Sequence, residues 1–566
     1  MAATARAGDC GSIGKGMAGA ERQDLSLLER CLSVFTRLRA GEGISLLLFA
    51  LYGYLLLLSY YILKTIREAL VLTQFSAEVR SYAVGTIALL LLFFVPIYSM
   101  LFRHTRKITL VRWITLFFVA NIVAFRAMAG VGMEIGFFYF VWVGIFGIIA
   151  VAQFWAFAAD AYNVKSGQRL FPFIMLGATA GALSGAQVTE YLTVNELVSP
   201  INMLLVGAAV LAATLLLGGA ARERIPPDSQ AVRFEEDEHD GAAHPLGGFA
   251  LVARDRYLLQ IAVLVILLNW VNTTGETILA DFVKAQAVEV AAAGGLSAGR
   301  FIAGFYGNFF FWVNLMGFLI QAFLVARIYR WIGVPGALLI LPIIAVLGYG
   351  LMVFLPVFSI IRLVKTLENS TDYSIMNTTR QAIFLPLPRA SKYEGKTTID
   401  TFFWRFGDLV QAGAFYVGLH LLHMTIPQFA FLNLLLALVW LWIALHIGRG
   451  YRDRAALAAA NSAPELGRPI PDAWAPPGSE LEHVVPADAF VDHDPGDMLT
   501  LSAALTGGRP LPGWLRFNAN TATFRGRVPS DHGNPRTEIE VIATDFEGLS
   551  ASGSFVVHHR RADDAG

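Results

Sequence analysis

Two basic side chains follow a long apolar run near the start of the sequence. The run extends from Ile44 to Leu63, and the stretch "KTIREAL" that follows it places Lys64 and Arg67 three residues apart. On a helix, residues with this spacing share one face. Lysine and arginine supply the charged N–H donors that bind phosphate. The pair therefore predicts an anion site in a cavity or, in the simpler alternative, two side chains that reach toward the membrane interface.

Further ionisable residues lie inside apolar runs, where a charge costs at least ~2.5–3.5 kcal/mol and normally faces a cavity or a partner. Asp160 ends the run "QFWAFAAD", and Glu276 lies well within another apolar run. The segment 361–380 holds five ionisable residues at helical spacing, namely Arg362, Lys365, Glu368, Asp372 and Arg380. We expect this stripe to face water or substrate, although Lys365 could instead form a structural ion pair with Glu368 or Asp372.

The next apolar run begins with more charged residues. They are Lys396, Asp400, Arg405 and Asp408. If Lys64, Arg67, Arg380 and Lys396 converge, they form an anion site to which both parts of the chain contribute.

The elements that must position these residues are membrane-length apolar stretches. The chain of 566 residues is 55% hydrophobic and 15% charged, and its mean hydropathy is +0.56. A span needs about 20 mostly apolar residues. Twelve such stretches are predicted at 44–64, 81–102, 108–127, 135–160, 170–192, 200–219, 257–283, 301–328, 331–353, 355–381, 397–422 and 427–447.

Basic residues predict the orientation of these spans, because they favour cytoplasmic segments. Arginines and lysines gather at 103–107, between 220 and 256, and at 449–454, whereas the loops at 128–134 and 193–199 hold none. Both termini are therefore expected in the cytoplasm, in the cell (inner) membrane. The expected parts are an N-terminal segment with a possible amphipathic helix (1–43), a six-helix half (44–219), a cytoplasmic linker (220–256), a second half (257–448), a basic and then Pro/Ala-rich linker (449–480) and a β-sandwich (481–560).

Several functional classes lack support in the sequence. The formal net charge is zero, which predicts no nucleic-acid partner. The two cysteines, Cys10 and Cys31, form no metal or disulfide pattern. We find no phosphate-binding P-loop and no catalytic constellation, so an enzyme and a bound cofactor are not expected. Glycines spaced by four residues at Gly177, Gly181 and Gly185 predict close helix packing.

Three stretches carry a family resemblance. They are "YYILKTIREAL", "FWAFAADAYNVKSGQRLFPFIMLGATAGALSGA" and "KTLENSTDYSIMNTTRQAIFLPLPRASKYEGKTTIDTFFWRFGD". Together they resemble the ATP:ADP antiporter family, and most closely its relatives in free-living bacteria, over residues 40 to 450. The resemblance implies an all-α, major-facilitator-like fold of two six-helix halves. It also implies nucleotide transport by alternating access, often as exchange of ATP for ADP with phosphate.

The resemblance also assigns residues. It matches the family's transport residues to Lys64, Asp160, Glu276, Arg380 and Lys396. Asp160 stands where a glutamate is common, and Arg380 stands where a lysine is common. These departures leave the substrate open between ADP/ATP, another nucleotide and a different organic or phosphorylated anion.

The tail after the helices has a different character. Short alternating runs between Gly, Pro and Asp turns predict a β-sandwich, and the pattern resembles the cadherin-like, Ig-like modules of dystroglycan type. Such modules can bind calcium, for which carboxylates are suitable ligands. Weak candidates are Asp492, Asp494, Asp497 and Asp545, which could equally be turn residues.

The main hypothesis is therefore a secondary transporter of nucleotides. Its expected contacts are the nucleotide, the lipid bilayer and a possible protein or carbohydrate partner of the tail. The rival hypothesis is a membrane-anchored interaction protein that acts through the tail.

Overall fold

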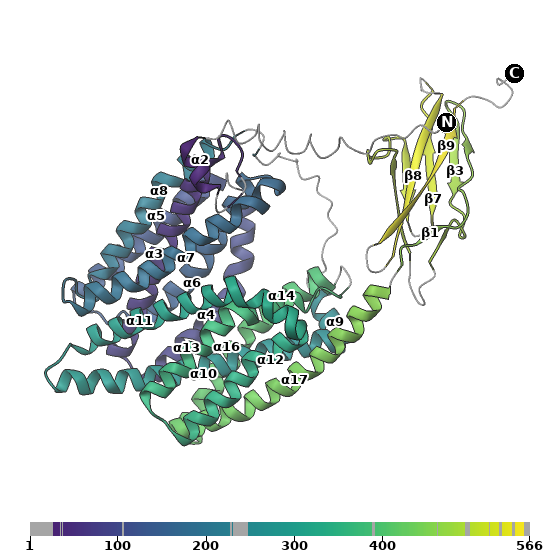
Figure 1. The fold of residues 1–566 in the computed structure, drawn as a ribbon. Coiled ribbons are helices and arrows are strands. Elements are labelled where there is room, and N and C mark those ends of the chain that lie inside the picture. Colours follow the sequence, from purple (N-terminus) through teal and green to yellow (C-terminus); the bar gives the residue numbers. More distant parts are fainter. Residues whose placement is uncertain are drawn as a thin grey trace, which may run out of the picture. The chain divides into compact units, whose positions relative to one another are not determined.

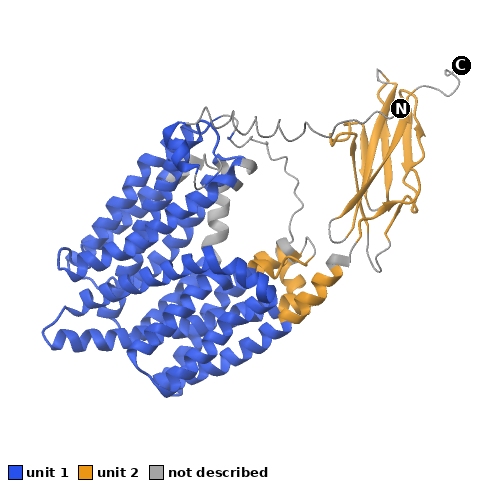
Figure 2. Ribbon diagram, in the orientation of Figure 1, with its two compact units in different colours: residues 1–243, 260–380, 399–446 blue, residues 244–259, 381–398, 447–566 orange. Residues whose placement is uncertain are grey.

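The computed structural model describes residues 26–33, 36, 38–104, 107–226, 229, 247–387, 391–460, 462–492, 499–519, 521–530, 535–545 and 549–559. Two compact units are distinguished. The first unit comprises residues 1–243, 260–380 and 399–446, and the second comprises 244–259, 381–398 and 447–566 (Figure 2).

The first half of the chain is helical (Figure 1). Its helices are α2 (Leu27–Leu32), α3 (Glu42–Gln74), α4 (Ala77–His104), α5 (Lys107–Gly130), α6 (Gly136–Ala161), α7 (Val164–Val194) and α8 (Met203–Glu223). The helix expected in the N-terminal segment is thus a six-residue element, α2, which Ser26 and Glu29 cap reciprocally. Asn163 caps α7 by accepting the backbone N–H of Ser166.

The second half is also helical but contains several π-helical segments, labelled η. Its elements are α9 (Gly247–Arg254), α10 (Arg256–Ala292), α11 (Ala298–Leu319), η2 (Ile320–Leu324), α12 (Val325–Phe354), α13 (Phe358–Thr371), η3 (Asp372–Met376), α14 (Asn377–Ala382), η4 (Ser391–Gly395), α15 (Lys396–Thr398), η5 (Ile399–Phe403), α16 (Trp404–Tyr416), η6 (Val417–Leu421) and α17 (Ile426–Ala460). The π-helical segments η3 and η4 therefore precede and follow Arg380 in the sequence, and such segments often occur at functional sites.

Eight helices in the described residues are long and apolar enough to cross a membrane. One of them, Ala298–Phe354, contains the two predicted spans 301–328 and 331–353 and is interrupted at Gly333, whose φ is 68°. The predicted spans 81–102, 355–381 and 397–422 do not meet this criterion but coincide with helical segments. The predicted polytopic helical fold is therefore confirmed, and the protein is a multi-pass membrane protein.

The first predicted span ends too early. The helix α3 continues ten residues beyond Lys64, to Gln74. The predicted span ends where the apolar run meets the charged residues. The chain remains helical beyond that point because Arg67 and Glu68 are buried and paired. Lys64 and Arg67 are thus not at the helix end, and the interface-reaching alternative does not describe Arg67.

The glycine ridge of α7 packs against α3, as predicted. A Cβ atom at Gly185 would lie 2.5 Å from the carbonyl oxygen of Leu58, and one at Gly181 would overlap that of Tyr54. Only glycine lets the two backbones approach this closely. The ridge therefore fixes α3, which carries Lys64, against its neighbour.

The two halves meet through α7 with α11 and through α4 with α16. A Cβ atom at Gly307 of α11 would lie 2.8 Å from the Ala186 carbonyl oxygen of α7. One at Gly85 of α4 would lie 2.7 Å from the Ala412 side chain of α16. These close contacts bring α3 and α4 of the first half beside α10, α11 and α13 of the second.

The tail forms a β-sandwich in the second unit. Its strands are β1 (Glu465–Leu466), β2 (Ala473–Trp474), β3 (Glu480–Val484), β4 (Phe490–Val491), β5 (Thr500–Leu505), β6 (Leu515–Asn518), β7 (Thr523–Arg527), β8 (Arg536–Thr544) and β9 (Ser550–His558). One sheet has the order β2-β9-β8-β5, a second has the order β3-β7-β6, and β1 pairs with β4. Phe524 and Phe555 join the two larger sheets in the core, with ring centroids 5.2 Å apart.

The sandwich begins before residue 481, which corrects the expected linker at 449–480. Within that range α17 extends to Ala460, and β1 and β2 are already strands. Each of these strands has only two residues and lies among prolines and glycines, so no alternating pattern marked it.

Candidate functional site

Arg67 and Glu68 of α3 belong to a buried series of ion pairs. Arg67 Nη2 lies 2.7 Å from Glu68 Oε1, and the guanidinium of Arg67 sits 4.0 Å above the Phe140 ring. Glu68 is fully buried and also pairs through Oε2 with Arg80 Nε, at 2.8 Å. A buried carboxylate between two arginines is compensated on both oxygens.

Arg80 extends this series of ion pairs to the second half of the protein. It lies in α4, and its Nη2 is 3.0 Å from Glu276 Oε2 of α10. The other Glu276 oxygen accepts a hydrogen bond from Asn369 of α13 at 2.6 Å. The side chains of Arg80 and Glu276 are 6% and 13% exposed, so this ion pair is largely removed from water. Glu276, expected to be functional, is thus half of a salt bridge between the halves.

Lys64 differs from its neighbours because no carboxylate pairs with it. Its Nζ lies 4.3 Å from the Phe310 ring centroid, 5.1 Å from Tyr61 and 5.9 Å from Tyr373. Among the described residues, Lys64 makes no ion pair or hydrogen bond. Aromatic faces attract a cation but do not neutralise its charge. Lys64 is therefore available to an anion.

The rings around Lys64 also bridge the two halves. Tyr61 of α3 donates its hydroxyl to Asn314 Oδ1 of α11 at 2.8 Å, and its ring centroid is 6.1 Å from that of Phe310. Tyr373 belongs to the π-turn η3. This aromatic box, formed by Tyr61, Phe310 and Tyr373, gives Lys64 a wall of π-faces on which a planar ring could stack.

Lys365 and Glu368 form the structural ion pair that was one of two alternatives. Lys365 Nζ lies 3.0 Å from Glu368 Oε2 and 2.8 Å from Asn272 Oδ1, and both charged side chains are buried. Tyr349 also donates to Glu368, at 3.2 Å. The pair joins α13 to α10 and α12 and leaves no site for a ligand at Lys365.

Arg380 and Lys365 have different immediate neighbours, although Asp372 interacts electrostatically with both. The π-turn η3 intervenes between them, so a regular 3.6-residue spacing does not hold across 372–376. The Arg380 guanidinium lies 4.0 Å above the Trp404 ring and interacts electrostatically with Asp400 and Asp372. Its Nε and Nη1 are buried without a hydrogen-bond partner among the described residues.

The remaining predicted residues take several positions. Arg405 pairs with Asp408 at 3.5 Å, and Asp408 accepts from Thr273 at 3.2 Å. Lys396 belongs to the second unit, where its Nζ lies 5.9 Å from the Phe384 ring centroid. Asp160 lies in α6, and its side chain is outside the described part of the structure. The structure thus brings Lys64 and Arg67 together with Glu276, whereas Arg380 lies beside Trp404, Asp372 and Asp400.

The calcium candidates receive little support. Asp545 Oδ1 accepts the backbone N–H of Leu549 at 2.8 Å, which is the turn role of the alternative. Asp494 and Asp497 lie outside the described residues, and Asp492 lies at their border. In the described part of the chain, no three His, Cys, Asp or Glu side chains are grouped to hold a metal ion.

Sequence reasoning missed Arg80, Glu68 and Asn369 as members of the site. Arg80 directly precedes the predicted span 81–102. One signal could have identified it, because a cation at the predicted outer end of a span runs against the usual charge bias.

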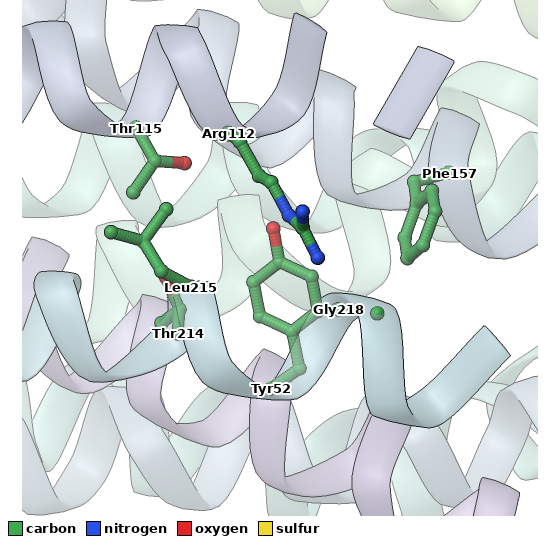
Figure 3. Close-up of a pocket in the computed structure, with 8 residues that line it drawn as sticks. Tyr52, Arg112, Thr115, Phe157, Thr214, Leu215 and Gly218 are labelled. Carbon is green, nitrogen blue, oxygen red and sulfur yellow. The ribbon is translucent and has the colours of Figure 1, made fainter. Parts of the chain in front are cut away.

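A small cavity elsewhere in the first unit is no alternative site. It lies among α3, α5, α6 and α8 and has a volume of only about 10 Å³ (Figure 3). Tyr52 and Arg112 point into it, beside Gly218. A space of this size holds one water molecule at most.

Known proteins resemble both parts of the chain. Residues 463–558 match the family described as putative Ig domain. Over 375 residues the chain is 23% identical to ADP,ATP carrier protein 1 of Chlamydia pneumoniae, which covers 58% of this chain and 70% of that protein.

Solved transporters share the fold. The structure of the nucleoside transporter NupG aligns with a TM-score of 0.52 and 13% identity, covering 73% of this chain and 99% of that one. A bacterial homologue of the human lysosomal transporter Spinster, inward-facing and unoccupied, aligns with a TM-score of 0.50 and 12% identity, covering 73% and 98%. The chain therefore has the fold of major-facilitator-like transporters, is similar in sequence to an ADP,ATP carrier, and ends in an Ig-like domain.

Proposed function

We propose that the protein is a secondary transporter that moves nucleotides, with ATP/ADP exchange as the expected mode. The observation that carries the proposal is Lys64, an unpaired cation inside an aromatic box where the two halves meet. Phosphate is a suitable counter-ion for Lys64, and a base could stack on Tyr61 or Phe310. The similarity to an ADP,ATP carrier supports the same substrate class.

The contacts between the halves support alternating access. Among the described residues, the hydrogen bonds and ion pairs that join the halves are Tyr61–Asn314, Arg80–Glu276, Ser81–Gln411, Phe75–Lys284, Glu190–Asn308, Glu196–Arg300 and Glu78–His420. Four of them involve Phe75, Glu78, Arg80 and Ser81, which lie where α3 ends and α4 begins. With the proposed cytoplasmic N-terminus, this end of the helices would face outward.

A bound anion would change the balance within this network. Lys64 interacts electrostatically with Arg67 and Glu276, as well as with Glu68 and Arg80. A phosphate group at Lys64 would attract Arg67 and Arg80 in competition with Glu68 and Glu276. Weakening of the Arg80–Glu276 pair would let the halves separate at the outer face, so substrate binding would be coupled to the change of access.

The remaining assignments follow from this proposal. The protein would reside in the cell (inner) membrane with both termini in the cytoplasm, where the Ig-like domain would contact a protein or carbohydrate. Arg380, with two unpartnered nitrogens, would offer a second anion contact along the path.

The decisive experiment is uptake of labelled ATP by proteoliposomes that contain the purified full chain. We expect saturable uptake that requires ADP inside the vesicles, with empty vesicles as the control. An equal rate of ATP uptake with and without ADP inside the vesicles would exclude exchange. Absence of any nucleotide uptake by folded, correctly oriented protein would contradict the proposed substrate class and leave another phosphorylated anion or the tail-centred function.

A further inference from the structure

A groove separate from the Lys64 site lies between α11 and α13. Its volume is about 350 Å³. Its walls are Phe309, Trp312 and Met316 of α11 and Phe358, Ser359, Arg362, Leu363 and Thr366 of α13. The walls are mainly apolar, and Arg362 is the only charged residue among those that line it.

The groove opens on a different side of α11 from the Lys64 site. Phe310 contacts Lys64, and Trp312 follows two residues later, about 200° around the helix. Trp312 is 45% exposed, and Leu363 on the opposite wall is 59% exposed. Apolar side chains this open, on a membrane-spanning protein, indicate a surface that faces lipid.

Arg362 gives the groove a specific polar feature. Its Nη2 donates to Asn308 Oδ1 at 2.6 Å, and its guanidinium lies 5.5 Å from the Phe305 ring centroid. Among the described residues, the Arg362 side chain makes no other hydrogen bond and no ion pair. Asn308 therefore orients the guanidinium of Arg362. The other N–H donors of this guanidinium remain available for an acceptor in the groove.

Arg362 lies close to the start of its helix, where a side chain can reach the phosphates of the lipid headgroups. The helix α13 begins at Phe358, and Arg362 follows four residues later, about 6 Å along the axis. Arginine near a helix end is favoured at the membrane interface. Met316 and Leu363 make the adjoining part of the groove wall apolar, as contact with an acyl chain requires.

We propose that this groove binds one anionic phospholipid of the phosphatidylglycerol type. Arg362 holds the phosphate diester, and the acyl chain lies along Trp312, Met316 and Leu363. No acidic side chain lines the groove, so nothing in it would receive the ammonium group of a zwitterionic lipid. The charge of the groove thus favours an anionic headgroup.

Native mass spectrometry of the full chain in detergent tests this proposal. Phosphatidylglycerol and phosphatidylcholine with identical acyl chains are titrated, and glycerol phosphate represents the headgroup without chains. We expect one tight phosphatidylglycerol per protein, weaker phosphatidylcholine and no retained glycerol phosphate. Arg362→Gln should weaken phosphatidylglycerol binding about tenfold, as expected for loss of a charged hydrogen bond, and Arg362→Lys should retain most of it.

Two further variants protect the test from a folding artefact. Arg327→Gln removes an exposed arginine of α12 that donates to the backbone carbonyl of Phe323 in η2, and this variant should bind as the unchanged protein does. Ser359→Phe fills the groove but keeps Arg362, and it should also weaken binding. Equal binding by the unchanged protein, Arg362→Gln and Ser359→Phe would overturn the proposal. Retention of glycerol phosphate as strong as that of the lipid would also overturn it, because it would indicate a soluble phosphate ligand.

Discussion

Arg80 of α4 and Glu276 of α10 form a salt bridge at 3.0 Å, and each belongs to a different half of the transporter. Arg80 is simultaneously held by Glu68 at 2.8 Å, so its guanidinium links three helices. The bridge couples the charges beside Lys64 to the contact between the halves. In the proposed alternating access, this bridge would break, and it is adjacent to the proposed substrate site.

Loss of Arg80 should therefore open the outer face. Arg80→Gln leaves Glu276 without its cation, and breaking a buried pair costs about 3–5 kcal/mol. Ser81, which bonds to Gln411 across the halves, can report opening as Ser81→Cys in a chain with Cys10→Ser and Cys31→Ser. We expect several-fold faster labelling by an impermeant maleimide from outside when Arg80→Gln is added.

The matched control is Arg300→Gln. This change removes an inter-half pair with Glu196 whose side chains are 24% and 61% exposed, and exposed pairs contribute about 0–1 kcal/mol. It should alter labelling little. Equal labelling rates in the Arg80→Gln protein and its parent would rule out the bridge as an outer gate.

Lys64 should be essential for uptake through its charge. Lys64→Gln keeps a polar side chain of similar length but removes the cation between the rings of Phe310 and Tyr61. We expect ATP uptake to fall at least tenfold, since a charged hydrogen bond contributes about 1.5–3 kcal/mol. Lys64→Arg should retain part of the activity. Unchanged uptake by Lys64→Gln would place the substrate elsewhere, for example at Arg380.

The sequence identified individual charges of the site better than their partners. The cost of a charge in lipid singled out Lys64 and Glu276 without any structure. Arg80 was missed because it precedes an apolar run, and only tertiary contacts show that it enters the membrane-embedded core. The π-turn at 372–376 changes the spacing between Lys365 and Arg380, and it has no clear signal in the hydrophobic pattern. The fold was more predictable than the site. The length of an apolar run predicts a membrane span, whereas the partner of a charged side chain depends on how the helices pack.

The close packing of α7 on α3 gives a prediction about stability. Gly181→Ala places a methyl group against the carbonyl oxygen of Tyr54, where a Cβ atom has no room. The helices must separate, so we expect a lower melting temperature and less folded protein. Gly413→Ala in α16 is the control because its Cβ atom would meet nothing within 4 Å. Alanine favours a helix over glycine by about 1 kcal/mol, so a melting temperature lowered equally by both changes would contradict this packing.

Lys365 and Glu368 should be needed as a pair and not for substrate binding. Lys365→Met leaves Glu368 as an uncompensated buried carboxylate, which costs about 3–5 kcal/mol, whereas replacing both partners can be nearly neutral. We therefore expect Lys365→Met alone to lower the yield of folded protein. The double change Lys365→Met with Glu368→Gln should restore folding and support ATP uptake. A folded double variant without uptake would instead assign this pair a part in transport.

The Ig-like tail should be dispensable for transport itself. Its core is formed by its own two sheets, as the contact between Phe524 and Phe555 shows, and the proposed nucleotide site lies in the first unit. A chain that ends at Ala460, where α17 ends, should therefore take up ATP at a rate within about twofold of the full chain. Loss of uptake would favour the rival in which the tail carries the function, provided that the shortened protein has the melting temperature of the full chain's helical part. Retained uptake would confine the role of the tail to partner binding.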